Sequence, residues 1–115
     1  MKIRTIYLLG QTMITNKSAA TNQIKTLSLY YYDGCPFCHI TQKALKQTER
    51  EVELNIELRN IQRQPQHRTE LIKQGGKPQV PCLRIDLADG KNTWLYESRD
   101  IIHFIRSYAA EIKLV

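Results

Sequence analysis

Cysteine is the residue type with the clearest chemistry in this sequence. A Cys-Pro-Phe-Cys motif occupies residues 35–38, directly after an Asp-Gly turn signal at residues 33–34. Pro36 favours the first turn of a helix, where free N–H groups and the helix dipole favour an anion. We therefore expect a lowered pKa for the Cys35 thiol and a nucleophilic thiolate. The turn is expected to leave this thiolate at an exposed loop tip.

Cys38 is expected to be the resolving thiol of the same motif. Residues three apart lie on one helix face, so Cys38 can approach Cys35 closely enough to form a redox-active disulfide. The thiolate is the form that attacks disulfides, so ionisation of Cys35 would act directly on the rate of exchange. The spacing therefore predicts thiol–disulfide exchange with Cys35 as the nucleophile.

A Cys-x-x-Cys pair also has other interpretations, namely half of a zinc site or a chance occurrence. Zinc requires about four ligands, and there is no second such pair. The remaining Cys and His residues are Cys82, His39, His67 and His103. Residues 35–39 also match the Cys-x-x-Cys-His pattern of covalent haem attachment, but a strand directly before the motif does not suit a small helical cytochrome. We expect no metal site, and we expect His39 to be an exposed helical residue.

Alternation of apolar and polar residues predicts the strands around the motif. Leu27, Leu29 and Tyr31 indicate a buried strand from about residue 26, and residues 52–58 indicate a second one. Between them, apolar residues recur at helical spacing over about residues 36–50. A strand–helix–strand unit of this length requires a parallel pair with a right-handed crossover.

The second half of the chain predicts a short helix, a hairpin and a long helix. Pro65 opens the short helix, and the Gly-Gly pair at residues 75–76 closes it. Residues 83–96 form the hairpin around an Asp-Gly turn, and Ser98 caps a last helix with an apolar stripe that reaches Ile112. This order predicts an α/β protein with a thioredoxin-like fold, a four-stranded mixed sheet flanked by helices.

Length and charge indicate one small domain behind a basic extension. Residues 1–25 of the 115 show no sustained periodicity, so we place the domain at residues 26–115. The formal net charge is +6, and the extension holds basic but no acidic residues. Its basic residues are Lys2, Arg4, Lys17 and Lys25. The domain holds 13 basic and 11 acidic side chains, so we expect no nucleic-acid partner.

The N-terminal sequence does not match a targeting or membrane segment. Its apolar stretch at residues 6–9 is broken by residues 10–12, and it is too short for a signal peptide or a transmembrane helix. We expect a cytoplasmic protein without membrane contact. In a reducing cytoplasm we do not expect the three cysteines to form a static disulfide framework.

Three motifs in chain order resemble the glutaredoxin family. They are Tyr-Tyr-Asp-Gly-Cys-Pro-Phe-Cys at residues 31–38, Gln-Val-Pro at residues 79–81 and Tyr-Glu-Ser-Arg-Asp-Ile-Ile at residues 96–102. The resemblance covers about residues 26–112. It is greatest to the glutaredoxins that are similar to the N-terminal domain of glutathione transferases.

The resemblance implies a glutathione site around the cysteine pair. It implies that Pro81 is a cis proline beside Cys35 and that the Val80 backbone pairs with the cysteinyl part of glutathione. It also implies that Glu97 and Ser98 hold the γ-glutamyl end. Ser98 and the N–H groups of the last helix suit a carboxylate, although a plain N-cap role for Ser98 is equally compatible with the sequence. The glutathione-binding residues implied in this way are Phe37, Gln79, Val80, Pro81, Glu97 and Ser98.

Two positions depart from the common glutaredoxin pattern. Tyr32 stands where many members have a lysine, and Phe37 stands where tyrosine is common. The first departure removes one cation that would stabilise the thiolate or bind glutathione, and the second removes a hydroxyl but keeps an aromatic wall. Cys82 has no catalytic counterpart, and we interpret it as a buried strand residue, with regulatory oxidation as the alternative.

The function that the resemblance implies is that of a dithiol glutaredoxin. Such an enzyme reduces glutathione mixed disulfides and protein disulfides, with glutathione as co-substrate and disulfide-containing or glutathionylated proteins as partners. We expect it to act as a monomer. Two alternatives remain open, a glutathione-linked iron–sulfur cluster carrier, against which Pro36 counts, and a noncatalytic adaptor of the same fold.

Overall fold

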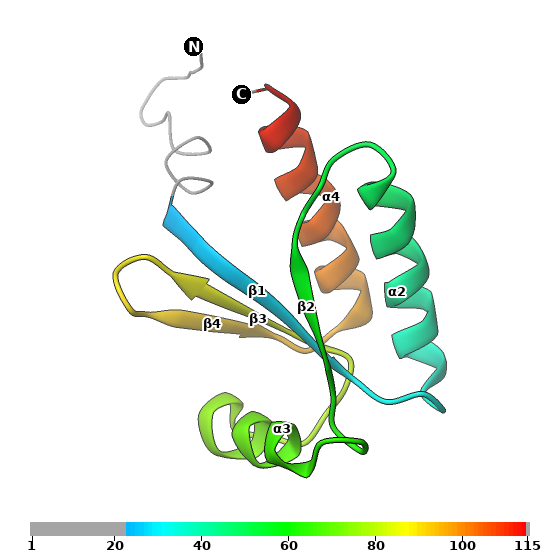
Figure 1. Ribbon diagram of the computed structural model, residues 1–115, viewed down its shortest axis with the longest axis vertical. Coiled ribbons are helices and arrows are strands. Elements are labelled where there is room, and N and C mark those ends of the chain that lie inside the picture. Colours follow the sequence, from blue (N-terminus) through cyan, green and yellow to red (C-terminus); the bar gives the residue numbers. More distant parts are fainter. Residues whose placement is uncertain (1–22, 115) are drawn as a thin grey trace.

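The chain folds around one four-stranded sheet, as the alternating pattern predicts. The computed structural model describes residues 23–114, so most of the basic extension lies outside the described residues. The strand order is β2-β1-β3-β4 (Figure 1). The strands are β1 (Ile24–Tyr31), β2 (Ile56–Asn60), β3 (Cys82–Leu87) and β4 (Asn92–Leu95). β1 and β2 are parallel, whereas β3 is antiparallel to both β1 and β4, which confirms the mixed sheet.

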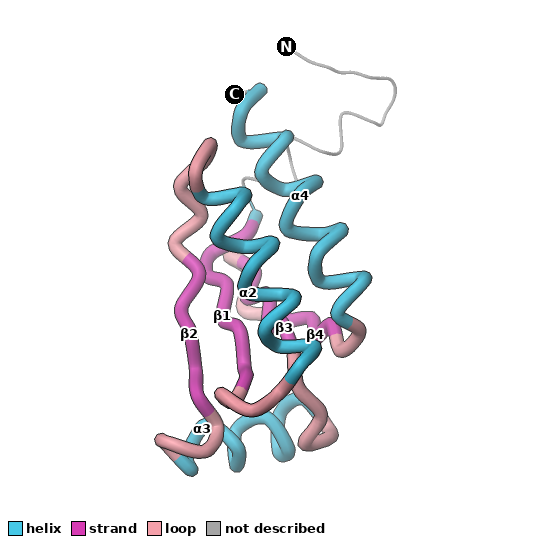
Figure 2. Tube along the Cα trace, turned by 90° about the vertical axis from the view of Figure 1, so that its right-hand side faces the viewer, coloured by secondary structure: helices cyan, strands magenta, loops and turns pink. Residues whose placement is uncertain are grey.

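Helices cover the two faces of the sheet unequally. α2 (Pro36–Glu49) and α4 (Ser98–Leu114) lie side by side over one face (Figure 2). The short helix α3 (Pro65–Glu70) continues as a single π-helical stretch, η2 (Leu71–Gly75). Leu71 packs with Tyr30 and Cys82, whose side chains point to the other face of the sheet. The cysteine pair at the start of α2 therefore lies at one end of the sheet, next to the end of β1.

The period of two along the strands divides the apolar residues between two cores. Leu27 and Leu29 of β1 pack with Leu83 of β3 and with Ile101 and Ile105 of α4. Tyr30, the next residue after Leu29, points to the opposite face and joins the cluster under η2. Because one face carries nearly all of the aliphatic residues, α2 and α4 are fixed there by burial of apolar surface.

Strand β2 begins later than the sequence pattern suggests. The alternation over residues 52–58 predicted a strand throughout, but the structure starts β2 at Ile56. Asn55 has φ of 56°, a left-handed conformation that cannot continue a strand. Val52 and Leu54 are still buried, so their periodicity reflects packing of a loop against the core.

Strand β1 starts at Ile24, two residues before the expected domain boundary at residue 26.

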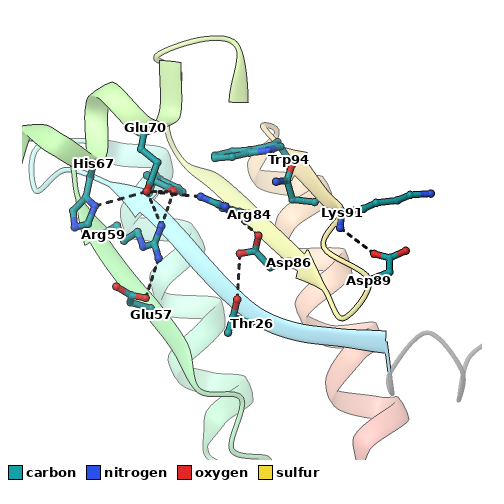
Figure 3. A network of polar contacts seen from close by, with 12 residues as sticks. Thr26, Glu57, Arg59, His67, Glu70, Arg84, Asp86, Asp89, Lys91 and Trp94 are labelled. Atoms are coloured by element: carbon teal, nitrogen blue, oxygen red, sulfur yellow. Dashed lines mark hydrogen bonds and ion pairs between the residues drawn. The ribbon is translucent and has the colours of Figure 1, made fainter. Parts of the chain in front are cut away.

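A polar network joins α3 to the sheet (Figure 3). The Tyr30 hydroxyl donates a hydrogen bond to the Glu70 carboxylate, and Arg59 donates to the same carboxylate at 2.6 Å. Arg59 also donates to the Tyr30 hydroxyl at 2.8 Å, and Arg84 lies 3.8 Å from Glu70. Buried polar groups must be paired, so these contacts fix where α3 sits on the sheet.

Replacing Gly75 should test how closely η2 packs on β4. A Cβ atom at Gly75 would overlap with the ring of Trp94 and the hydroxyl oxygen of Tyr96. We expect Gly75→Ala to lower the free energy of unfolding by about 1–3 kcal/mol, because backbone and rings must move apart. Urea unfolding followed by circular dichroism measures this. Gly34→Ala is the matched control, because a Cβ there meets only ordinary contacts with Tyr32, and an equal loss in both variants would contradict the explanation.

Candidate active site

Cys35 occupies the N-cap position of α2. Its φ of −90° and ψ of 114° are extended, and the helix begins with Pro36 directly after it. The Sγ atom of Cys35 accepts a hydrogen bond from the Cys38 backbone N–H at 3.1 Å. Its carbonyl accepts the helical bond from the His39 N–H at 3.1 Å. The predicted position of Cys35 at a helix N-terminus is thus confirmed, and a backbone donor points at its sulfur.

A second segment of the chain, around Val80, also lies near the Cys35 sulfur. The Sγ atom of Cys35 lies 4.0 Å from the carbonyl oxygen of Val80. The Val80–Pro81 peptide bond is cis, as the family resemblance implied. Residues 45 positions apart in the sequence therefore meet at the nucleophile.

The expectation that Cys35 lies at an exposed tip is wrong. The residue is only 4% exposed, and Cys38 is 1% exposed. The chain folds back at the turn, where the Cys35 N–H bonds to the Tyr32 carbonyl at 3.3 Å, and the Val80 segment lies against the sulfur. Phe37, in contrast, is 61% exposed. A substrate must therefore approach closely and in a defined direction to reach the sulfur.

The two cysteines have different surroundings. Burial raises the pKa of the Cys38 thiol well above its ordinary value, and the neighbouring Cys35 sulfur raises it further. Cys38 therefore remains a neutral thiol at neutral pH. The backbone N–H group that contacts the Cys35 sulfur belongs to Cys38 itself. The Cys38 thiol is therefore close to any disulfide that forms at Cys35.

The loop before Cys35 is held by side chains that the sequence analysis did not single out. The Asp33 carboxylate accepts from Arg63 Nη2 at 2.6 Å and from Asn60 Nδ2 at 3.4 Å. The Asn60 side-chain oxygen in turn accepts from the N–H groups of Gln62 and Arg63 at 2.9 and 3.0 Å. The His39 ring donates to the Asp33 carbonyl. The only sequence feature that pointed to these contacts was the expected parallel pair of strands, which places the end of β2, with Asn60, beside the end of β1.

The residues expected to bind glutathione fall into two linked groups. The Val80 carbonyl, which precedes the cis bond to Pro81, lies near the Cys35 sulfur, and the exposed Gln79 side chain donates to the Tyr96 carbonyl at 3.4 Å. Tyr96 lies two residues before the start of α4, and the Glu97 carbonyl between them accepts the first helical bond from Ile101 at 2.9 Å. The hydrogen bond of Gln79 thus connects the cis-proline loop to the N-terminus of α4.

Ser98 is not at the cap of α4, contrary to the expectation. The helix starts at Ser98, and the carbonyl of Glu97 is the first acceptor, so Glu97 holds the cap position. Within residues 23–114, no hydrogen bond joins the side chain of Phe37, Glu97 or Ser98 to Cys35. Phe37 lies in the first turn of α2, Ser98 is the first residue of α4, and Glu97 directly precedes it.

Cys82 faces away from this site. It is fully buried on the opposite face of the sheet from α2, next to Tyr30 and Leu71, which confirms its interpretation as a buried strand residue. Burial raises the pKa of its thiol to about 12.

Within residues 23–114, no three His, Cys, Asp or Glu side chains gather in a way that could hold a metal ion. No helix in the same part of the chain is long and apolar enough to cross a membrane.

A sequence model of the glutaredoxin family matches residues 27–87, more than half of the chain. The chain is a member of the glutaredoxin family. The matched span contains Cys35, Cys38 and the Val80–Pro81 bond, and it ends before Glu97 and Ser98. Comparison with curated protein sequences gives no match.

Solved structures with a thioredoxin fold resemble this glutaredoxin-family chain. Maleylacetoacetate isomerase from Anaeromyxobacter dehalogenans 2CP-1, with bound GSH in its active site, is 25% identical with a TM-score of 0.50. This comparison covers 77% of the present chain and 40% of the isomerase. The C-terminal domain of Neisseria meningitidis DsbD is 16% identical with a TM-score of 0.54, over 84% of this chain and 93% of that domain. The J-Trx1 fragment of ERdj5 is 15% identical with a TM-score of 0.52, over 87% of this chain and 50% of the fragment.

The extent of these matches differs between the solved structures. The chain spans half or less of the lengths of the ERdj5 fragment and the isomerase. It spans nearly all of the DsbD domain, so the likeness there covers one whole thioredoxin-fold unit. At 15% and 16% identity these likenesses establish the fold.

Removing the Asn60 side chain should loosen the loop that carries Cys35. We expect Asn60→Ala to lower the free energy of unfolding by about 1–3 kcal/mol, because two backbone N–H groups and Asp33 lose a buried partner. Thermal unfolding measures the loss. Alkylation of Cys35 in a Cys38→Ser background should also change in rate.

Arg63→Ala is the control for this prediction. It removes only an ion pair between two largely exposed side chains, so stability should change little. A larger loss in Arg63→Ala than in Asn60→Ala would show that the ion pair, rather than Asn60, holds the loop.

Proposed function

We propose that this chain is a glutathione-dependent thiol–disulfide oxidoreductase that reduces glutathione mixed disulfides and protein disulfides. Membership of the glutaredoxin family supports thiol–disulfide chemistry in general. The observation that carries the proposal is the hydrogen bond from the Cys38 N–H to the Cys35 sulfur at the start of α2. Donors and the positive end of a helix dipole at a thiol favour its anionic, nucleophilic form.

The first half of the proposed reaction is an attack by the Cys35 thiolate on a mixed disulfide between a substrate and glutathione. A bond forms between the Cys35 sulfur and the glutathione sulfur, and the bond between the glutathione sulfur and the substrate sulfur breaks. The substrate sulfur leaves with the bonding electron pair and takes a proton from water. The substrate is reduced to a thiol, and Cys35 is oxidised to a glutathione adduct.

The second half can follow either of two routes. A second glutathione thiolate attacks the glutathione sulfur of the adduct, which forms glutathione disulfide and returns Cys35 as a thiolate. Alternatively, Cys38 loses its proton and attacks the Cys35 sulfur, which closes the 35–38 disulfide and releases glutathione as a thiol. Because burial keeps Cys38 protonated at neutral pH, we propose that the glutathione route is the faster one.

Glutathione binding is proposed along the segments that meet at Cys35. The Val80 carbonyl near the sulfur can accept from the backbone N–H of a cysteinyl residue joined to Cys35. The N–H groups that open α4 suit the γ-glutamyl carboxylate, and Glu97 suits its ammonium group. The contact between Gln79 and Tyr96 joins these two subsites into one surface. The solved isomerase relative holds bound GSH in its own active site, which supports the same assignment here.

Exchange of each cysteine for serine tests the assigned roles. We expect Cys35→Ser to abolish turnover of a glutathionylated peptide with glutathione, because serine is not a nucleophile for disulfides at neutral pH. Cys38→Ser should retain turnover, since the glutathione route does not use Cys38. Coupled consumption of NADPH by glutathione reductase follows the rate. Cys82→Ser is the matched control and should keep full activity, and loss in Cys38→Ser with survival in Cys35→Ser would reverse the assignment.

The rate of disulfide closure should increase with pH. The raised pKa of Cys38 means that its thiolate fraction, and with it the closure rate, increases about tenfold per pH unit throughout the neutral range. The measurement is release of glutathione from the preformed Cys35–glutathione adduct between pH 6 and pH 8. The Cys38→Ser adduct is the control and should release none. A rate that is flat across this range would show that Cys38 is already ionised.

A further inference from the structure

Charged side chains are distributed differently over the two faces of the sheet. On the face that carries α3, Arg59 and Arg84 contact the carboxylates of Glu57, Glu70 and Asp86, so positive charge is compensated there (Figure 3). On the face covered by α2 and α4, exposed basic side chains line both helices. We call these residues the basic helical face: His39, Lys43, Lys46, Arg50, Arg99, His103, Arg106 and Lys113.

The basic residues of α2 form one stripe that points away from the sheet. They are spaced four, three and four positions apart, from His39 to Arg50, which places them on one side of a helix. All are exposed. The buried residues of α2 lie on the opposite side and are Cys38, Thr41, Ala44 and Leu45. The stripe is therefore presented to solvent along the whole helix.

The basic residues of α4 extend the same surface. Arg99, His103 and Arg106 are spaced four and three apart and are exposed, as is Lys113. The two helices lie side by side over one face of the sheet (Figures 1 and 2). A shallow groove between their C-terminal halves is lined by Gln47 and Thr48 from α2 and by Arg106, Ala109, Ala110 and Lys113 from α4, together with Glu51. The groove between the helices thus carries the basic residues Arg106 and Lys113 of α4, while the stripe of α2 lines a separate hollow.

Few carboxylates neutralise this surface. Lys113 pairs with Glu51 at 2.6 Å, and within residues 23–114 none of the other seven basic residues of the face forms a salt bridge. Like charges four positions apart on a helix repel and slightly destabilise it. The stripe therefore gives no stability to the fold, and its uncompensated charge is available to a negatively charged partner.

The stripe begins at the active site. His39 is one helical turn beyond Cys35, and the stripe extends about 16 Å to Arg50. About five residues of extended peptide span that distance. Phe37 and Ile40, both exposed and apolar, lie beside its start and can contact an apolar residue near the disulfide of a substrate. A chain whose sulfur reaches Cys35 can therefore continue along the stripe.

We propose that the basic helical face docks an acidic segment of the protein substrate whose disulfide Cys35 attacks. The proposal rests on the proposed function. Because Cys35 is nearly buried, an attacking geometry requires the partner to be oriented, and carboxylates on Lys43, Lys46 and Arg50 would orient it. A nucleic acid or an anionic membrane would also meet the charge, but neither supplies the sulfur that the end of the stripe faces.

Two glutathionylated peptides of equal length test this docking role. Each carries one cysteine, followed by four glutamates in one peptide and four glutamines in the other. The K43E/K46E variant reverses two charges in the centre of the stripe. The control variant K73E/K91E makes the same change in net charge at exposed positions outside the face, on η2 and between β3 and β4. Neither variant touches the cysteines or the cis-proline loop.

The wild-type protein should turn over the glutamate peptide with a higher kcat/KM than the glutamine peptide. We expect K43E/K46E to lower kcat/KM for the glutamate peptide about tenfold and to leave the glutamine peptide unchanged. The control variant should retain the preference, and high salt should abolish it in the wild type. Circular dichroism confirms that each variant is folded.

Four outcomes contradict the proposal. Equal kcat/KM for both peptides in the wild type would overturn the docking role alone, as would equal losses in the two charge variants. Binding of a fluorescent oligonucleotide or of phosphatidylserine vesicles that K43E/K46E abolishes, without any peptide preference, would assign the face to that partner instead. Failure of the wild type to turn over either peptide would overturn the proposed function and the docking role with it.

Discussion

The active site depends on one hydrogen bond, from the Cys38 N–H to the Cys35 sulfur. It forms because α2 begins at Pro36, so that Cys35 is still extended while Cys38 is already helical. The same turn buries the Cys38 side chain against the sheet and raises the pKa of its thiol. One local geometry therefore makes two chemically identical side chains unequal, with a backbone donor directed at the first sulfur and burial that disfavours an anion at the second.

Long-range contacts hold that helix start in place. The register of the parallel pair sets Tyr31 opposite Asn60, which brings Asn60 within reach of Asp33 in the loop before Cys35. The antiparallel pair sets Tyr30 opposite Cys82, and so places the Val80–Pro81 segment against the sulfur. The position of Cys35 is thus a consequence of strand pairing on both sides of β1. This central strand determines where the nucleophile lies as well as where the cores form.

Sequence periodicity predicted the elements better than it predicted the site. Alternation in residues 27–31 and helical spacing from Pro36 depend on neighbours a few positions away, so both were recognisable. The start of β2 was not, because Asn55 adopts a left-handed conformation although its neighbours alternate. Burial of Cys35 depends on Val80, and the anchoring of Asp33 depends on Asn60 and Arg63, 27 and 30 positions away. Such contacts have no local signal, and the cis proline was expected only from the family resemblance.

The net charge gave an incomplete description of the domain for a related reason. A count of 13 basic against 11 acidic side chains after residue 25 suggests a nearly neutral body. Folding separates these charges, because the sheet surface under α3 brings cations and carboxylates from different elements within bonding distance, as with Arg59 of β2 and Glu70 of α3. A helix instead gathers residues from its own sequence on one side, and along α2 one outward stripe carries Lys43, Lys46 and Arg50, while the exposed Glu49 lies beside it. Electrostatic attraction at a nearly buried thiol acts mainly on how often a partner arrives in the correct orientation. In this fold the helix whose first turn contacts the Cys35 sulfur therefore also carries the charges that we propose select what reaches it.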